Sequence, residues 1–176
     1  FGGRTMAFDA NGNLTTLQEG PTLQAFTWDA RDRLRVLTGS ATSATFAYDV
    51  LGCRVERTVN GLLTQFHYDG HDLVRETGTG EATYLRTLAI DEALVRTEGA
   101  ESLHSLADAL GSTVALTDSS GPPVTEYTYE PFGRTTLSGA PSAHPFQFTG
   151  RENDGTGLYY YRARYYHPST NRFLSE

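Results

Sequence analysis

Short runs of apolar, β-branched and aromatic residues alternate along the chain with clusters of turn-forming residues. One stretch reads Arg54–Val59, then Asn60-Gly61, then residues 62–68. Asn-Gly between two such runs is the strongest short-range signal for a β-hairpin. A second stretch follows the same order, with Thr113–Thr117 before a turn and residues 124–129 after it. Extended over the chain, the pattern predicts about 14–17 short antiparallel strands in one continuous meander.

An aromatic–Asp pair recurs in the first half of the chain at a spacing of twenty residues. The four pairs are Phe8-Asp9, Trp28-Asp29, Tyr48-Asp49 and Tyr68-Asp69, and Gly52 follows the third pair. An Asp side chain accepts hydrogen bonds from main-chain amides two residues on and so starts a turn, while Gly tolerates a positive φ. The aromatic residue ends a strand and can pack across to its neighbour. A fixed period of this kind predicts a repeat architecture in which neighbouring units stabilise one another.

The second half keeps the same pattern less strictly. Further copies are Asp108 with Gly111, Tyr129 with Glu130 and Gly133, and Asp154 with Gly157. Asp91 falls 22 residues after Asp69 and resembles a degenerate copy. We therefore expect one array of about eight units without separate domains.

Residues 102–111 allow two interpretations. Leu103, Leu106 and Leu110 have helical spacing and Gly111 could end a helix. Alternatively, a strand ends at Ala107 and the Asp108 turn follows. The repeat register favours the strand.

Composition narrows the class of protein. Apolar residues make up 38%, aromatic residues 11%, and the mean hydropathy is −0.41. This balance favours an all-β chain over a helical bundle or a doubly wound α/β enzyme. No apolar run approaches the roughly 18–20 residues of a membrane-spanning helix, and no export signal lies within this segment. The net charge of −7 disfavours a nucleic-acid partner.

Candidate chemistry is sparse. Cys53 is the single cysteine, and an inert thiol is the favoured interpretation. Residues 9–13 resemble an acidic calcium loop, but they lack the Gly and Glu spacing of an EF-hand. His67 and His71 flank a turn and are interpreted as a chance surface pair. We expect no catalytic residues, no metal and no cofactor. The Tyr- and Arg-rich residues 159–166 could stack on a sugar or a nucleic acid, although packing against neighbouring strands is favoured.

On these residues the chain resembles YD-repeat (RHS) proteins, whose repeats build the shells of insecticidal toxin complexes and teneurins. Residues 148–176 are similar to the RHS core-associated segment, and the match rests on Arg151, Asp154, Gly157, Tyr159, Arg164, Arg172 and Phe173. The resemblance divides the chain into YD repeats at residues 1–146 and the start of a truncated core-associated segment at 147–176. Asn171 stands where the family usually has Gly, and Cys53 where many copies have Arg. The family's later cleavage motif is not in this sequence.

The resemblance implies a structural role. It predicts a β-sheet strip that spirals into a shell around a C-terminal toxin, in a bacterial protein that is secreted or on the cell surface. The partners would be the rest of the shell and the toxin, and not nucleic acid or a membrane. A large enclosed volume would explain the low aliphatic content, because the inner face would meet cargo or water. The alternative is an extracellular adhesion or carbohydrate-binding module.

The ends of the strip carry a further expectation. Residues 5–8 and 159–165 are rich in β-formers, and no Lys protects either edge. We expect the isolated segment to associate through these edges with copies of itself rather than to behave as a monomer.

Overall fold

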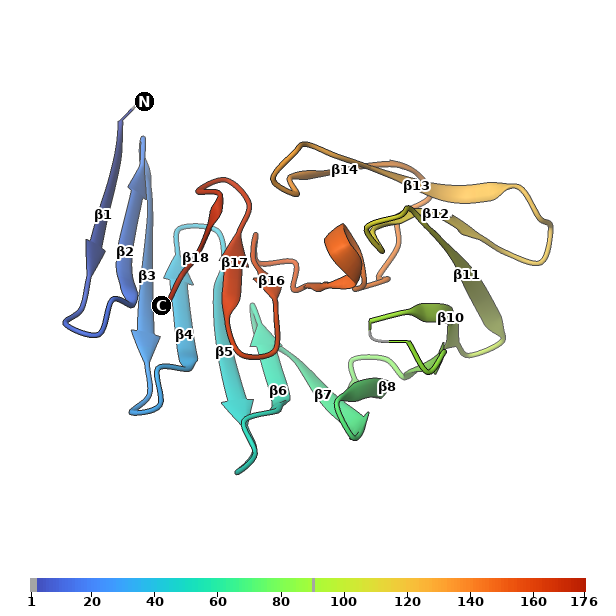
Figure 1. The fold of residues 1–176 in the computed structure, drawn as a ribbon, viewed down its shortest axis with the longest axis horizontal. Helices are drawn as coiled ribbons and strands as arrows, with labels where there is room; N and C mark the ends of the chain where they lie inside the picture. Colours follow the sequence, from blue (N-terminus) through green and yellow to red (C-terminus); the bar gives the residue numbers. More distant parts are fainter. Residues whose placement is uncertain (1–2, 90) are drawn as a thin grey trace. The chain divides into compact units, whose positions relative to one another are not determined.

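The computed structural model describes residues 3–89 and 91–176, and it is almost entirely β-structure (Figure 1). The long sheet contains β1 (Arg4–Phe8), β2 (Leu14–Glu19), β3 (Thr22–Trp28), β4 (Leu34–Gly39), β5 (Ser43–Tyr48), β6 (Arg54–Val59), β7 (Leu62–Asp69), β8 (Asp72–Gly78), β9 (Ala82–Arg86), β10 (Ala93–Glu98), β11 (Glu101–Ala107), β12 (Thr113–Thr117), β13 (Pro123–Tyr129) and β14 (Thr135–Gly139). After the 3-10 turn η1 (Phe148–Gly150) come β15 (Glu152–Asn153), β16 (Tyr159–Tyr160), β17 (Tyr165–His167) and β18 (Arg172–Phe173). None of these described segments is an α-helix, and none could cross a membrane as a helix.

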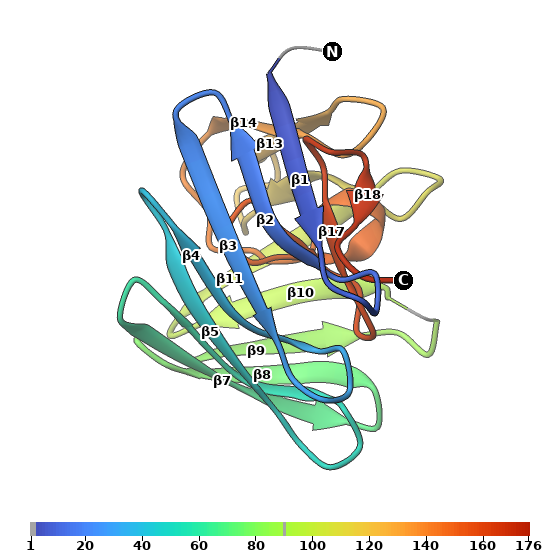
Figure 2. The same ribbon diagram turned by 90° about the vertical axis from the view of Figure 1, so that its left-hand side faces the viewer.

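The order of strands in the long sheet is the order of the chain, from β1 to β14. Its described pairings are antiparallel, and Figure 2 shows β1 to β5 running side by side. The prediction of an all-β antiparallel meander is confirmed. Residues 102–111 form the end of β11 and the turn after it, so the strand interpretation is also confirmed.

The C-terminal residues differ from the prediction of one continuous meander. Strands β15 to β18 form a second sheet of four strands. The expected strand at 159–165 is two strands, because Arg162 adopts a φ of +61° and a turn joins Tyr161 N–H to the Arg164 carbonyl at 2.8 Å. With these short strands, residues 3–89 and 91–176 contain 18 strands.

The chain divides into two compact units, each described by itself. The first holds Phe1–Thr64 and Gly155–Glu176, and the second holds Gln65–Asp154. The core of the first unit contains Leu14, Leu17, Phe26, Leu34, Leu37, Ala44 and Phe46 from the meander and Leu158, Tyr160, Tyr165 and Leu174 from the C-terminal segment.

This core lies between the meander and the C-terminal residues. In the first unit, residues 155–176 pack on the apolar face of the meander. Phe46 contacts Tyr165 with ring centroids 5.0 Å apart, and Leu158 and Leu174 are buried. The side chains therefore form a buried core, which the hydrophobic effect stabilises.

The second unit has a smaller core built largely from rings. Phe66, Leu73, Ala82, Tyr84 and Phe146 are buried together. Phe146 comes from the segment after β14, and its ring meets Tyr84 edge-on at 5.1 Å. A returning segment thus also covers part of the meander within this unit.

Candidate functional site: the ladder of repeat turns

Each of four repeat turns pairs its own main-chain groups in the same way. In the turn after Trp28, the N–H of Asp29 donates to the carbonyl of Arg33, and the N–H of Asp32 donates to the carbonyl of Asp29, both at 3.0 Å. Equivalent bonds form in the turns that begin at Asp9, Asp49 and Asp108. At each turn the pairing of the flanking strands shifts at the residue before the Asp. The pattern is a tight hairpin turn closed by a β-bulge.

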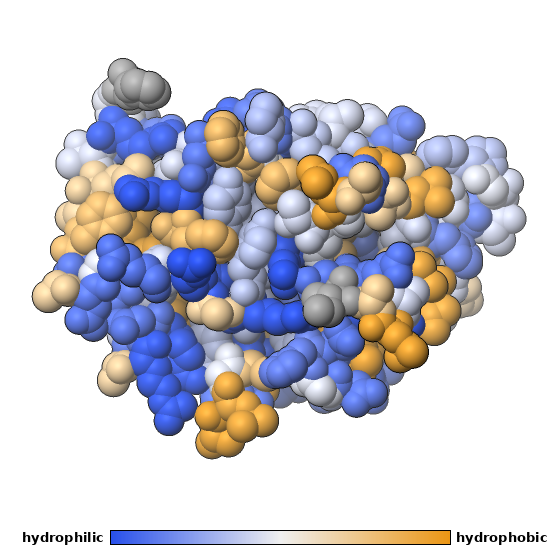
Figure 3. Space-filling view, viewed as in Figure 1, coloured by the Kyte–Doolittle hydropathy of each residue, from blue (hydrophilic) through white to orange (hydrophobic). Residues whose placement is uncertain are grey.

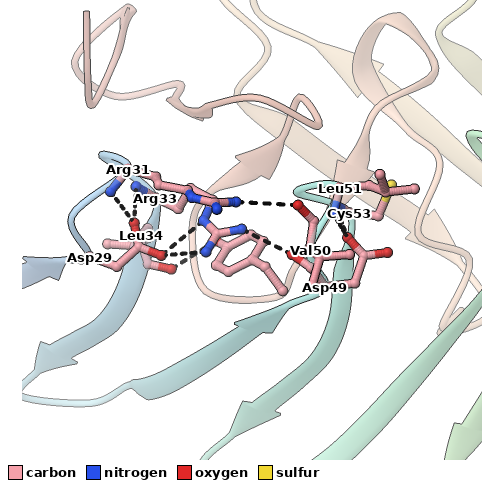
Figure 4. Close-up of polar contacts among 9 residues, drawn as sticks. Asp29, Arg31, Arg33, Leu34, Asp49, Val50, Leu51 and Cys53 are labelled. Atoms are coloured by element: carbon pink, nitrogen blue, oxygen red, sulfur yellow. Dashed lines mark hydrogen bonds and ion pairs between the residues drawn. The ribbon is translucent and has the colours of Figure 1, made fainter.

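The Asp carboxylate holds this turn from inside. Oδ1 of Asp29 accepts the N–H groups of Arg31 and Arg33 at 2.9 and 3.1 Å, and Oδ1 of Asp49 accepts those of Leu51 and Cys53 at 2.9 Å (Figure 4). Asp9 and Asp108 accept the corresponding amides.

These bonds favour the charged carboxylate. Donation from the side chain and main chain of Asn13 lowers the pKa of Asp9. At Asp29, burial acts to raise the pKa, but hydrogen bonds from Arg33 and Arg31, together with the charge of Arg33, outweigh burial and lower the pKa. The folded turn therefore stabilises the ionised form of the carboxylate.

The third residue after the Asp needs a left-handed backbone. Gly12, Gly52 and Gly111 have φ values of +84°, +93° and +79°. A Cβ at Gly52 would meet no neighbouring atom, so the requirement there is one of backbone conformation. Asp32 occupies the same position in the second turn with a φ of +57°.

The Glu130 turn keeps the main-chain bonds without an Asp. The N–H of Glu130 donates to Arg134 at 2.9 Å, and the N–H of Gly133 donates to Glu130 at 2.8 Å. A Cβ at Gly133 would overlap the ring of Phe148. Gly is therefore required at this position for space as well as for its φ of +84°.

The aromatic residue of a repeat bonds back to the preceding repeat. Nε1–H of Trp28 donates to the carbonyl of Leu14 at 2.8 Å, and the hydroxyl of Tyr48 donates to the carbonyl of Leu34 at 2.7 Å. Both acceptors lie five residues after the Asp of the previous turn. In the second half, the hydroxyl of Tyr129 donates in the same way to Thr113. Sequence reasoning assigned these rings to packing and missed their role as donors.

Neighbouring turns of the first unit are also joined through side chains. Nδ2 of Asn11 and of Asn13 donate to Oδ1 of Asp32 at 3.0 and 2.7 Å. The second turn is joined to the third by Arg31 and Arg33, which donate from Nη1 to the carbonyls of Val50 and Asp49, each at 3.2 Å (Figure 4).

These contacts follow one positional rule. The donors stand two and four residues after the Asp, and the acceptors stand in the next turn. Short Asn side chains meet a carboxylate, whereas longer Arg side chains reach main-chain carbonyls. The turns together form a continuous hydrogen-bonded series, which we call the turn ladder, comprising residues 9–13, 29–33 and 49–53.

Other predicted repeat residues lie in different surroundings. Asp69 ends β7, and only Gly70, with a φ of +60°, and His71 separate it from β8. Tyr68 lies half-buried against the core of the second unit. Asp154 is buried, and Gly157 has a φ of +87°.

Residues of the C-terminal motif serve packing and charge pairing. Nη2 of Arg151 lies 2.8 Å from Oδ2 of Asp91, the degenerate repeat residue. Tyr159 and Tyr160 are buried, as the packing interpretation of residues 159–166 requires. The guanidinium groups of Arg164 and Arg172 lie over the rings of Phe173 and Phe8, with Cζ 4.0 and 5.5 Å from the ring centroids.

Arg54 is a buried residue that sequence reasoning did not single out. It stands five residues after Asp49, where the two earlier repeats have Leu14 and Leu34, and its side chain is fully buried. Its guanidinium lies over the ring of Tyr160 at 4.1 Å, and its Nη1 donates to the hydroxyl of Tyr165 at 3.2 Å.

The candidate reactive side chains Cys53 and His67 each lie close to other protein groups. Burial and the nearby Asp49 raise the pKa of the Cys53 thiol, against a smaller opposing effect of Arg162, so the protonated thiol is favoured. His67 contacts the hydroxyl of Thr77 at 3.1 Å. Within residues 3–89 and 91–176, no three His, Cys, Asp or Glu side chains gather in a way that could hold a metal ion.

A continuous antiparallel meander whose aromatic–Asp turns bond to one another defines a YD-repeat shell protein. The model of the teneurin YD-shell family matches residues 1–176, and the chain belongs to this family.

Curated relatives carry varied names. The chain is 34% identical over 182 residues to the tRNA3(Ser)-specific nuclease WapA of Bacillus spizizenii, covering 97% of this chain and 8% of that protein. It is 29% identical to double-stranded DNA deaminase toxin A of Burkholderia cenocepacia and 30% identical to toxin subunit YenC1 of Yersinia entomophaga, covering 96% of this chain in each case. It spans 15% and 20% of these two proteins.

Solved structures show the same fold. The Tc holotoxin pore of Photorhabdus luminescens matches with a TM-score of 0.73 and 22% identity, over 96% of this chain and 9% of that one. The TcdB2–TccC3–Cdc42 structure matches with a TM-score of 0.68 and 20% identity, over 98% and 12%.

Proposed function

We propose that this chain is a wall segment of a YD-repeat shell that encloses a polypeptide toxin, and that the segment itself is not catalytic. The observation that carries the proposal is the turn ladder. Its bonds join the first three repeats one to the next, and an arrangement that depends only on neighbouring repeats suits a wall built by adding hairpins.

The relatives support a carrier role. Proteins named as a tRNA nuclease, a DNA deaminase toxin and a toxin subunit share this segment, which spans only 8–20% of their lengths. A segment common to proteins with different named activities is better suited to a shared carrier function than to any one of those activities. The partners of this chain would then be further shell repeats and a toxin, in a bacterial protein that is secreted or on the cell surface.

Protease protection tests enclosure. In the natural protein that contains this chain, we expect any toxin region to resist limited proteolysis while the shell is folded. The double variant Trp28→Phe, Tyr48→Phe removes two bonds between repeats and should expose that region at a lower urea concentration. Equal digestion of the toxin region in the intact protein and as an isolated domain would contradict the proposal.

An assay of the segment alone tests the second part of the proposal. Residues 1–176 should not cleave tRNA or deaminate double-stranded DNA, whereas the natural full-length protein serves as the positive control if it carries such a domain. Turnover by the segment would overturn the non-catalytic role.

We still propose that the sheet associates through its edge strands, but these strands differ from the ones expected from the sequence. β1 and β14 stand at the two ends of the long sheet, whereas residues 159–165 lie in the second sheet. We expect further repeats to pair with β1 and β14 in a shell, and copies of the isolated segment to pair there in solution. Sedimentation of the segment at micromolar concentration tests this, and a single monomeric species of 19.3 kDa would contradict it.

A further inference from the structure

The segment after β14 returns over the second unit and is anchored there by aromatic contacts. Residues 142–147, which we call the strap, lie between β14 and η1, in the orange part of the chain in Figure 1. The ring of Phe146 in the strap meets Tyr84 of β9 edge-on at 5.1 Å, and the guanidinium of Arg86 lies over the same ring at 4.9 Å. The strap therefore covers part of the core of the second unit.

His144 is the second ring of the strap, and only 1% of its surface is exposed. Nε2 of His144 lies 3.3 Å from Oγ of Ser105 in β11, and its ring lies 5.8 Å from the ring of Phe146. Within residues 3–89 and 91–176, no carboxylate forms an ion pair with His144. These surroundings favour a neutral imidazole, because a buried charge without an opposite charge is costly.

The nearest charge that acts on His144 is positive. Arg96 of β10 is itself buried, and its Nη1 lies 2.6 Å from Oε2 of Glu98. Burial, and the nearby charge of Arg96, lower the pKa of His144 to about 3, against a smaller opposing effect of the Phe146 main chain. Protonation of His144 would therefore place a second cation in the same part of the core.

Further ionisable groups lie in this part of the second unit: Glu76, Tyr84, Glu98, Tyr127 and Glu152. The two tyrosines stay neutral in acid, because burial raises the pKa of both hydroxyls. The carboxylates act on Arg96 or on Tyr84. In the described residues none of them pairs with His144, so a charge on this ring would have no partner while the strap is in place.

We propose that the strap is an acid-sensitive latch: protonation of His144 releases residues 142–147 from the second unit while the meander beneath them stays folded. The released imidazolium would be hydrated, and the contacts of Phe146 with Tyr84 and Arg86 would be lost with it. This inference concerns the second unit alone and does not rest on an enclosed toxin.

Proton uptake sets how strongly acid acts on the strap. In the released strap His144 would have its ordinary pKa of 6.5, whereas in the closed strap its pKa is about 3. Release between these two pH values therefore takes up one proton. The equilibrium constant for release should rise about tenfold for each pH unit below 6.5.

Hydrogen exchange of main-chain amides, followed by mass spectrometry, measures release in the natural protein that contains this chain. Two amides report on the strap: the N–H of Thr113 donates to the carbonyl of Gln147 at 3.2 Å, and the N–H of Asn153 donates to that of Pro145 at 2.8 Å. After correction for the intrinsic pH dependence of exchange, protection of peptides that contain these amides should fall about tenfold per pH unit from pH 6.5 to 4.5. Peptides from the middle of β11 should stay more protected.

Exchange is preferred to a hydrophobic dye as the readout. Figure 3 shows hydrophobic side chains among hydrophilic ones on the surface of the second unit, and Leu88 and Leu110 are among its exposed residues. A dye could bind to this surface without any release, whereas exchange reports on bonds that the strap itself makes.

Variants at position 144 separate the latch from a general effect of acid. His144→Gln and His144→Phe cannot gain the charge, and both should make protection of the strap amides independent of pH from 6.5 to 4.5. His71→Gln, at an exposed turn position of the same unit, is the matched control and should keep the tenfold dependence. His167→Gln removes a buried histidine of the first unit and should also keep it.

Three results would overturn the inference. They are strap amides whose protection does not change from pH 6.5 to 4.5, an equal loss of protection in the strap and in β11, and an unchanged pH dependence in His144→Gln. If neither variant at position 144 folds, the comparison of the strap with β11 in the wild-type protein still decides.

Discussion

The hydroxyl of Tyr48 donates a hydrogen bond to the main-chain carbonyl of Leu34 at 2.7 Å, across 14 residues of sequence. Tyr48→Phe removes the donor and leaves the ring in place. We expect the free energy of unfolding to fall by about 1–2 kcal/mol, because the carbonyl at the start of β4 loses its partner in a partly buried place. Urea titration followed by tyrosine and tryptophan fluorescence measures the change. Thr83→Val removes a hydroxyl from an exposed strand position and should change the free energy by less than about 0.5 kcal/mol; equal effects of the two variants would contradict the role of Tyr48.

A double-mutant cycle tests the turn ladder between the first two repeats. Asn13 donates to Asp32 at 2.7 Å, and Asp32 stands where the other turns have Gly. Asp32→Gly should relieve the positive φ and at the same time remove the acceptor, so its single effect should be small. Combined with Asn13→Ala, it should reveal a coupling free energy of about 0.5–1.5 kcal/mol. Additive effects would show that the two turns are energetically independent.

Gly52 tests the left-handed position of the third turn. Gly52→Ala should destabilise the chain by about 1 kcal/mol, because φ is +93° although space is open. Gly52→Asn should cost less, since Asn tolerates this backbone region. Thermal unfolding of both variants measures the order, and an alanine variant as stable as the wild type would contradict the assignment.

Leu158 tests the covering of the first unit by the C-terminal segment. Its side chain is fully buried, and Leu158→Ala should lower the free energy of unfolding by about 2–5 kcal/mol. Leu88→Ala, at a fully exposed position, is the control and should have almost no effect. A small loss at Leu158 would mean that the segment does not complete the core.

Acid should destabilise the chain through two buried histidines. Burial, and the nearby charge of Arg96, lower the pKa of His144 to about 3. Burial lowers the pKa of His167 to about 4. Between these values and the ordinary pKa of 6.5, the unfolded chain binds protons that the folded chain does not. The free energy of unfolding should therefore be highest above pH 6.5 and should fall as the pH is lowered toward 4.

The slope of stability against pH measures this effect. From pH 6.5 to 4.5 each histidine contributes up to about 1.4 kcal/mol per pH unit. His144→Gln should remove one contribution, whereas His71→Gln, at an exposed turn position, should not. The lowered carboxyl pKa values of Asp9 and Asp29 act below about pH 3.8, outside this window. An unchanged slope in His144→Gln would contradict the prediction.

The local structure of the repeats could be predicted because it depends on local chemistry. β6 (Arg54–Val59) and β12 (Thr113–Thr117) have the predicted bounds, since Asn-Gly and Asp turns fix where each strand begins and ends. The twenty-residue period also decided between helix and strand for β11. These signals lie within a few residues of the elements they specify.

The contacts between repeats could not be predicted in the same way. Whether Trp28 reaches Leu14, or Asn13 reaches Asp32, depends on strand register and on bulges that shift pairing by one residue. The place of residues 159–165 was missed because a run of β-formers does not show that Arg162 will adopt a left-handed backbone and break it. The burial of Arg54 could not be predicted, because the two earlier repeats have Leu at this position. The residues that accommodate its guanidinium, Tyr160 and Tyr165, come from the C-terminal segment.

The large separation in sequence between Arg54 and these two tyrosines has a consequence for how the chain folds. The hairpins of the first unit form between residues close in sequence, but Arg54 meets Tyr165 across 111 residues. During synthesis the apolar face of β2 to β6 remains uncovered until β16 to β18 have been made. Closing so long a loop slows folding. We expect a rapid phase in which the hairpins form, followed by a slow phase in which residues 158–174 dock on the meander. An intermediate that binds a hydrophobic dye should disappear in the slow phase, and it should persist in a chain that lacks residues 158–174.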